Sequence, residues 1–371
     1  MMTMDRAETD PPAQHGEART NRNVSGELEE TFEELLAVHP SISGAVVWID
    51  RRDEASLSGS FGWLSHERTD PASIESTFRL ASNTKTFAAA AMLRLAETGS
   101  LSIDQRIVEL LPTDFLSFLA ELRPFAHLDE MTVRHLLQHT SGVRAPLADA
   151  EYMEIVGRDP THRWTPEEQI RLWVEDQSPL ASPGRVSTYS DAGYVVAAVL
   201  MEHVAQMPLA RIYRKFLDFD RLGLSSTFLE TCEDVPEGLG PRIHQYTDTL
   251  DVTAFDPSFD LYAAGGLVSS ARDLCRFWRA LFSGDVFGDG RSLGLMCSTV
   301  PVDETDRAGL GMFEKTVAGA RVWHHSGFFG SFAAHCPELG VTVAGMANQA
   351  SIGWPSQHRS QLLDRLIILA A

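Results

Sequence analysis

The amino-acid sequence predicts an α+β fold, in which one antiparallel sheet is built from both ends of the chain and a helical segment lies between them. Strand-like runs occupy residues 44–50 and 56–63, on either side of a polar turn. Similar runs return near the C-terminus at residues 321–324, 331–335 and 341–346. Strands at both ends of a chain, with helical patterns between them, indicate a sheet that both ends share.

The remaining elements follow in chain order. Residues 1–23 are polar and predict a disordered tail. Ser25 is a candidate N-cap for a first helix, whose apolar face would be formed by Leu28, Phe32, Leu35 and Leu36. Residues from about 104 to 250 contain many prolines and predict helices and loops, and residues 356–369 predict a closing helix. No internal repeat is visible.

Composition excludes several classes of function. The chain has 371 residues, of which 44% are hydrophobic and 22% charged, as in ordinary globular enzymes. A net charge of −20 argues against nucleic acid as a partner. No apolar run is long enough for a membrane span or a secretory signal, and the four cysteines show no paired spacing. We therefore predict a cytoplasmic protein with free thiols.

A Ser-x-x-Lys element, from Ser82 to Lys85, is the strongest chemical signal. It opens an apolar helical run at residues 86–96 that ends near Gly99. Positions i and i+3 share one helix face, so the lysine can lie beside the serine hydroxyl. A serine becomes a nucleophile when a neighbour takes its proton. The alternative is an N-cap serine followed by a solvated lysine.

Two further motifs follow in the chain, at residues 189–191 (Tyr-Ser-Asp) and 325–327 (His-Ser-Gly). In this order the three motifs resemble those of the penicillin-recognising serine enzymes, above all the class C β-lactamase branch with its D-alanyl carboxypeptidases, D-aminopeptidases, family VIII esterases and acyltransferases. Residues 131–142 and 264–274 are similar to characteristic stretches of that family. The resemblance covers about residues 25 to 371.

The resemblance implies a β-lactamase/transpeptidase-like fold, an antiparallel sheet flanked by helices plus a mostly helical lobe. Residues 24–371 would form one catalytic domain, with an α/β lobe from 24–103 and 251–371 and a helical lobe from 104–250. The active site would lie between the lobes. No metal and no cofactor are implied.

Site roles are carried over from the resemblance residue by residue. Ser82 is the expected nucleophile, and Lys85 with Tyr189 the expected proton-handling pair, Tyr189 acting as a phenolate. The backbone N–H groups of Ser82 and Phe328 are the expected oxyanion hole. Gly327 is expected to let the substrate approach the strand edge closely.

Two positions depart from the family pattern. Asp191 stands where asparagine is usual, and an ionised carboxylate only accepts hydrogen bonds. It favours the charged form of Lys85, which moves the base role toward Tyr189. His325 stands where many relatives have lysine, and a mostly neutral histidine gives no firm anchor for a substrate carboxylate. A structural histidine is the alternative at this position. Both departures favour a neutral or cationic substrate.

The third motif also supplies candidate substrate contacts. Ser326 and Gly327 are expected to line the site together with Asp191 and His325. The adjacent Phe328 and Phe329 are interpreted either as an apolar wall for the substrate or as core packing.

Other motifs are weaker. Residues 290–294 fit the Gly-x-Ser-x-Gly pattern around Ser292, but a Gly- and Asp-rich loop precedes them instead of the buried strand that a nucleophile elbow requires. His135 and His139 have the i, i+4 spacing of metal ligands. The glutamate of a zinc-protease motif is missing, so we expect these two histidines to cap and pack.

The sequence therefore predicts a serine acyl hydrolase that forms an acyl-enzyme at Ser82 and cleaves an ester or amide of a small neutral or cationic metabolite. A transacylase that uses the same acyl-enzyme is an alternative, and a D-alanyl carboxypeptidase or β-lactamase is a second. A catalytically inactive binding module on the same fold is a third. The oligomeric state stays open.

Overall fold

The computed structural model describes residues 21–143, 149–174, 178–351 and 353–371, and within these ranges eight strands form one antiparallel sheet. Its order is β2-β1-β13-β12-β11-β10-β9-β8, so the N-terminal hairpin pairs with the last strand of the chain. Ala45 of β1 lies opposite Ala347 of β13 and Phe61 of β2. The predicted sheet that both chain ends share is confirmed.

The strands of this sheet are β1 (Gly44–Arg51), β2 (Leu57–Gly62), β8 (Val300–Pro301), β9 (Arg307–Ala308), β10 (Phe313–Val317), β11 (Ala320–Ser326), β12 (Ser331–Cys336) and β13 (Val341–Ala347). Two small sheets contain β3 (Thr77–Arg79), β7 (Leu267–Ser270) and β4 (Phe228–Leu229), and β5 (Tyr246–Thr247) with β6 (Leu250–Asp251). The α-helices are α1 (Asn21–Val38), α2 (Thr84–Glu97), α3 (Thr113–Ala120), α4 (Val133–Leu137), α5 (Asp149–Gly157), α6 (Pro166–Val174), α7 (Asp191–Ala205), α8 (Leu209–Leu217), α9 (Phe219–Leu222), α10 (Ala271–Ser283), α11 (Gly290–Met296) and α12 (Ser356–Ala370). Short 3₁₀ turns are η1 (Ala81–Asn83), η2 (Ile107–Glu109), η3 (Arg123–Phe125), η4 (Leu128–Glu130) and η5 (Pro257–Asp260).

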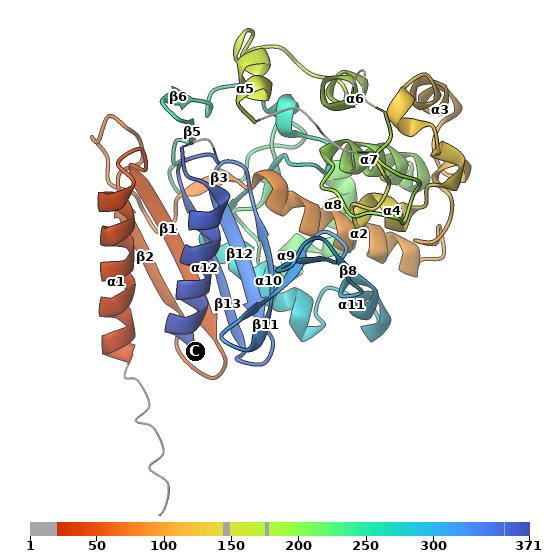
Figure 1. Cartoon of the computed structure of the whole chain (residues 1–371). Helices are drawn as coiled ribbons and strands as arrows, with labels where there is room; N and C mark the ends of the chain where they lie inside the picture. The colour runs from red at the N-terminus through yellow and green to blue at the C-terminus, as the bar shows by residue number, and fades with distance from the viewer. Residues whose placement is uncertain (1–20, 144–148, 175–177, 352) are drawn as a thin grey trace, which may run out of the picture.

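Helices cover both faces of the large sheet (Figure 1). On β1, Val47 and Ile49 pack with α1 and α12, whereas Val46 faces the core that contains α10 and α2. This alternation is the period-two pattern of a strand buried on both faces. The helices between residues 84 and 222 gather on the α10 side of the sheet, and this helix-rich part forms one wall of the site described below.

The structure differs from the predicted elements at three places. Helix α1 begins at Asn21, four residues before the predicted cap Ser25, and residues 1–20 of the predicted tail lie outside the described residues. The region from 104 to 250 contains the two-residue strands β4, β5 and β6 in addition to helices. The large sheet also extends through β10, β9 and β8, which alternation alone did not predict because two of them have only two residues.

Strand β3 delivers the chain to the start of α2 through a strained turn. Ala81 is fully buried and has a φ of +45°, in the left-handed region that residues other than glycine rarely adopt. Ser82 follows in η1, and Lys85 lies in the first turn of α2. Strain of this kind persists only where the surrounding structure imposes it, which is common at functional sites.

Candidate active site

The Lys85 ammonium lies at the centre of the candidate site. Its Nζ donates to Ser82 Oγ at 3.0 Å, to Asp191 Oδ1 at 2.6 Å and to the Ala264 carbonyl at 2.6 Å. The side chain is fully buried. An ammonium has three donors, and each has an acceptor here. The structure therefore brings Ser82, Lys85 and Asp191 into one hydrogen-bonded group.

The segment that supplies Ala264 also fixes the start of α2. Leu80 N–H donates to the Leu267 carbonyl at 2.7 Å, and Leu267 N–H donates to Thr84 Oγ1 at 3.3 Å. Strand β7 thus holds the chain on both sides of Ser82. The family-like stretch at residues 264–274 has a physical role here, because it holds the segment that carries Ser82 and accepts a hydrogen bond from Lys85.

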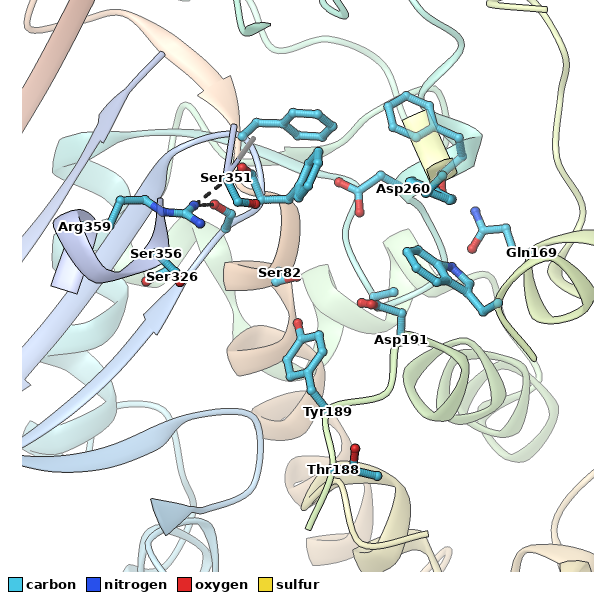
Figure 2. A pocket seen from close by; sticks show the side chains of 17 residues that line it. Ser82, Gln169, Thr188, Tyr189, Asp191, Asp260, Ser326, Ser351, Ser356 and Arg359 are labelled. Carbon is cyan, nitrogen blue, oxygen red and sulfur yellow. Dashed lines mark hydrogen bonds between the residues drawn. The ribbon is translucent and has the colours of Figure 1, made fainter. Parts of the chain in front are cut away.

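Tyr189 lies beside the same group. It lies two residues before α7, whose N-cap Ser190 accepts a hydrogen bond from Gly193 N–H at 3.3 Å. The Tyr189 ring centroid is 5.0 Å from Lys85 Nζ, and its hydroxyl points toward Ser82 (Figure 2). With 37% of its surface exposed, the phenol is open to a ligand in the cavity.

His139 holds the backbone on both sides of Tyr189. Its carbonyl accepts from Thr188 N–H at 2.8 Å, and its Nδ1 accepts from Ser190 N–H at 3.2 Å. The two rings lie 4.5 Å apart. Burial lowers the pKa of His139 well below its usual value, and the Lys85 charge lowers it further. A neutral ring with an unprotonated Nδ1 is what the Ser190 hydrogen bond requires.

The third motif lies at the end of strand β11, which contacts the η1 turn that carries Ser82. His325 is buried, and its Nδ1 lies 2.9 Å from the Ser326 carbonyl. Burial lowers the pKa of His325 to about 3, so the ring is neutral at ordinary pH and supplies no fixed cation. Its ring centroid is 6.3 Å from that of Tyr189, and the side chain does not line the cavity. The structure thus places His325 behind Tyr189, whereas Ser326 does line the cavity.

Gly327 and Phe328 occupy the turn after β11. A Cβ on Gly327 would come within 2.2 Å of both the Leu80 carbonyl and Ser331 Oγ, so the close approach that requires glycine is to the protein itself. The Phe328 N–H makes no hydrogen bond to the described part of the chain and remains available to an oxyanion. The buried Asn83 amide, next to Ser82 in the chain, contacts the same turn, since it lies 2.9 Å from Ser331 Oγ and 3.2 Å from the Gly327 nitrogen.

A cavity of about 590 Å³ opens beside these groups (Figure 2), and its size suits a small-molecule ligand. Of the residues described so far, it is lined by Ser82, Tyr189, Asp191, Ala264 and residues 326–328. Phe328 and Phe329 both lie in its wall, and Phe329 also packs against Phe259, so the two interpretations of this aromatic pair both apply. The structure adds lining residues that no motif indicates: Tyr152, Gln169, Trp173, Thr188, Phe259, Asp260, Ser351, Ser356 and Arg359.

Two charged groups among these additions matter for the electrostatics of the cavity. Arg359, from α12, donates through Nη1 to the Gly327 carbonyl at 2.6 Å and is largely buried, so its charge supports the turn that carries Phe328. Asp260 follows Phe259 in η5, and burial raises the pKa of its carboxyl to about 7. Neither residue belongs to a sequence motif; only their position in the folded chain reveals them.

Comparison with known proteins identifies the family of this chain. The family described as Beta-lactamase matches residues 28–365. The chain belongs to the beta-lactamase family. Penicillin-binding protein 4* of Bacillus subtilis (strain 168) is 27% identical over 279 residues, 71% of this chain and 57% of the relative. Esterase EstB of Burkholderia gladioli is 33% identical over 141 residues, 38% of this chain and 33% of EstB. The chain thus spans little more than half the length, or less, of these relatives.

Solved structures confirm the predicted fold of this beta-lactamase family member. A D-stereospecific amidohydrolase from Streptomyces sp. superposes with a TM-score of 0.74 at 25% identity, over 90% of this chain and 97% of the amidohydrolase. A D-amino acid amidase from Ochrobactrum anthropi SV3 gives a TM-score of 0.77 at 22% identity, over 94% and 97% of the two chains. The proteins that this chain resembles therefore include one named as an esterase and two named as amide-cleaving enzymes.

The competing motifs have structural roles in this beta-lactamase family member. Ser292 lies in α11 and donates to Glu97 at the end of α2, away from the residues that line the cavity. His135 accepts from Thr132 N–H at 3.2 Å in a capping box, and His139 supports the Tyr189 segment. The capping and packing roles are confirmed. Among the described residues no group of three His, Cys, Asp or Glu side chains is arranged to hold a metal ion.

No single helix in the described ranges is long and apolar enough to cross a membrane, although the pair α7 and α8, bent by 74°, meets the criteria of length and composition when taken together.

Proposed function

We propose that this chain is a serine acyl hydrolase that forms an acyl-enzyme at Ser82 and cleaves an ester or amide of a small neutral or cationic metabolite. The observation that carries the proposal is the contact of 3.0 Å between Lys85 Nζ and Ser82 Oγ, beside a phenol that points toward the same oxygen. An alcohol and a phenol that open into one cavity, with a buried ammonium in contact with the alcohol, form the parts of an activated nucleophile.

In the acylation step, Ser82 Oγ attacks the substrate carbonyl carbon while its proton passes to the Tyr189 oxygen. Because Lys85 makes three hydrogen bonds as an ammonium, it is better suited to stabilise a phenolate than to take the proton itself. The N–H groups of Ser82 and Phe328 hold the resulting oxyanion. Each such donor contributes on the order of a hundredfold to the rate.

The tetrahedral intermediate collapses when the bond to the leaving group breaks. The leaving alcohol or amine takes the proton from Tyr189, and the acyl group remains on Ser82. Water then attacks the acyl carbon and gives its proton to Tyr189, which returns it to Ser82 Oγ as the acid departs. Every proton that is removed in one half-reaction is thus returned within the same cycle.

The proposed substrate charge follows from the charged and titratable groups in and near the cavity. His325 is neutral, and Arg359 already donates to the backbone of the 325–328 turn. The net charge of −20 also disfavours anions. A neutral or cationic ester or amide is therefore the proposed substrate, and we place the reaction in the cytoplasm as part of the same proposal.

The test is hydrolysis of p-nitrophenyl butyrate by the wild-type protein and by the Ser82→Ala and Ser292→Ala variants. We expect Ser82→Ala to lose about 10⁴-fold or more of kcat/KM, because the acyl-enzyme cannot form without its oxygen. Ser292→Ala removes a serine hydroxyl outside the cavity and should leave kcat/KM essentially unchanged.

Labelling by a fluorophosphonate, followed by peptide mass spectrometry, identifies the nucleophile directly. Modification of Ser82 is expected, and equal labelling of the wild type and Ser82→Ala would contradict the proposal. In a separate experiment, an alkylamine is added to the ester reaction and the product masses are measured by mass spectrometry. The masses show whether water or the amine accepts the acyl group. No labelling and no turnover would favour an inactive binding module.

A further inference from the structure

Asp260 places a second carboxyl group in the wall of the cavity, near the Lys85 and Asp191 pair. Its Oδ2 is buried and has no hydrogen-bond partner among the described residues, and no ion pair joins it to a lysine, arginine or histidine of those residues. The nearby Arg79 is bound to Glu230 at 2.6 Å. A carboxylate that is withdrawn from water without a cationic partner is unfavourable, so this group is arranged to receive one.

The segment that carries Asp260 is held firmly from both sides. Tyr152 of α5 donates its hydroxyl proton to the Phe259 carbonyl, and Gln169 of α6 donates to the Ser258 carbonyl. A Cβ on Gly265 would lie 2.4 Å from Asp260 Oδ1, so glycine at that position leaves the room that the carboxyl occupies. The carboxyl is thus fixed in place and points into the cavity (Figure 2).

Aromatic rings surround the same part of the cavity. Tyr152 and Trp173 stack with their centroids 4.2 Å apart, and both line the cavity together with Phe259 and Phe329. Aromatic faces attract cations through their quadrupole, and this attraction strengthens when the cation is desolvated. A carboxyl group without a partner and a set of aromatic walls are independent features, and both select for an organic cation.

We propose that Asp260 binds the ammonium group of the substrate, and that the proposed hydrolase acts on esters or amides that carry a primary ammonium beside an apolar group. Asp191 is not assigned this role, because its negative charge is already paired with the Lys85 ammonium at 2.6 Å. The inference extends the proposed function to a substrate class. Ligand binding can nevertheless be measured without turnover, so the ammonium-binding inference and the proposed hydrolase function can be tested separately.

The charge state of Asp260 gives this site a characteristic pH dependence. Burial is the largest cause that raises the pKa of its carboxyl to about 7; the charges of Asp191 and Glu230 raise it further, and those of Lys85 and Arg79 oppose this. Above this pH the group is ionised and attracts an ammonium, and below it the group is neutral. Affinity for a cation should therefore rise by about tenfold between about pH 6 and about pH 8, while affinity for a neutral isostere stays constant.

The probe pair is 2-phenylethylammonium, an amine that remains protonated over this range, and neutral 2-phenylethanol. Each is titrated by calorimetry and tested as a competitive inhibitor of p-nitrophenyl butyrate hydrolysis. The wild-type protein should bind the amine more tightly than the alcohol by about tenfold or more at about pH 8, since a hydrogen bond to an ionised group is stronger than a neutral one. Asp260→Asn should abolish both this preference and its pH dependence.

Asp248→Asn is the matched control, because it removes the same charge from an exposed side chain outside the cavity and should leave both properties unchanged. If Asp260→Asn does not fold, the inference is tested on the wild-type protein by the protons that it releases when the amine binds. Binding of the amine at about pH 7 should release about half a proton, measured in buffers of different ionisation enthalpy. Equal affinity for amine and alcohol, or no proton release, would overturn the inference. Loss of ester turnover alone would contradict only the proposed function.

Discussion

Two carboxyl groups face the same cavity in opposite situations. Asp191 accepts a hydrogen bond from Lys85, whose two remaining donors are bound to Ser82 and Ala264, so that the ammonium of this region is fully partnered. Asp260 has a buried oxygen without any partner among the described residues, and its pKa is raised to about 7. The first region holds a fixed charge distribution, whereas the second changes its charge near neutral pH.

The difference separates chemistry from recognition. A group that stabilises charge during a reaction is most effective when its own partners are already in place, because no reorganisation is then needed. A group that selects a ligand gains most when the ligand supplies its missing partner. We therefore expect substitutions around Lys85 to change turnover, and substitution of Asp260 to change which ligand is preferred.

After the loss of Ser82 itself, the largest effect is expected from Tyr189→Phe, which removes the phenol oxygen but keeps the ring beside His139. Losing a general base should lower kcat by about 10² to 10⁴-fold with little change in KM, measured with p-nitrophenyl butyrate. Tyr194→Phe is the control. The Tyr194 ring lies 5.5 Å from Lys85 Nζ, close to the 5.0 Å of Tyr189, but its hydroxyl is buried and donates to the Leu137 carbonyl.

Tyr194→Phe should therefore cost about 1 kcal/mol of unfolding free energy and leave kcat nearly unchanged. If Tyr194→Phe and Tyr189→Phe reduced kcat equally, the assignment of the proton to Tyr189 would be wrong.

A smaller effect is expected from Asp191→Asn, which replaces an ion pair with a neutral hydrogen bond to Lys85. Charge-assisted hydrogen bonds are about twice as strong as neutral ones, so kcat/KM should fall by about tenfold or somewhat more. The decrease in kcat/KM should be similar for a neutral ester and for its amine-bearing counterpart, because the ion pair that is lost joins two protein residues, Asp191 and Lys85, and does not involve the substrate. A loss confined to the amine-bearing ester would assign Asp191 to ligand recognition and contradict the division between the two regions.

Much of this arrangement can be predicted from sequence, because its elements carry local signals. The run at residues 86–96 and the alternation of β1 and β2 predict a helix and a hairpin, and the structure contains both. Helix α10 has apolar residues at helical spacing, Leu274, Phe277, Trp278 and Leu281, and could have been predicted by the same rule. Short motifs predict Ser82, Lys85 and Tyr189 as site residues, and the structure brings these residues together.

The remaining parts of the site have no local signature. Asp260 and Arg359 are single charged residues in unremarkable sequence, and they become informative only when the fold encloses one and turns the other toward a backbone carbonyl. The close approach of Gly327 to Leu80 joins residues 247 positions apart (327 − 80), which no pattern along the chain reveals. Long-range contacts of this kind determine which side chains are buried, and burial is the largest cause of the pKa shifts of Asp260 and His325.

The smallest effect concerns His139, which supports the Lys85 region from behind Tyr189. Its φ of +57° suits asparagine, and an asparagine Oδ1 can take the place of Nδ1 as acceptor for Ser190 N–H. We expect His139→Asn to keep kcat within about threefold of the wild type and His139→Leu to lose about fivefold, since leucine leaves that N–H without its acceptor.

Stability provides the readout that distinguishes support by a neutral histidine from simple packing. The folded-state pKa of His139 lies well below the ordinary 6.5, so its contribution to folding is complete above that value and is lost as the pH falls toward the folded pKa. Asparagine does not titrate. In urea unfolding, the stability of the wild type relative to His139→Asn should therefore decrease by about 1.4 kcal/mol for each pH unit below about 6.5. His325 has a lowered pKa in both proteins and cancels from the difference. A difference that stays constant between about pH 7.5 and about pH 5.5 would show that His139 can be protonated without cost, and Tyr189 would then have to be held by its other contacts.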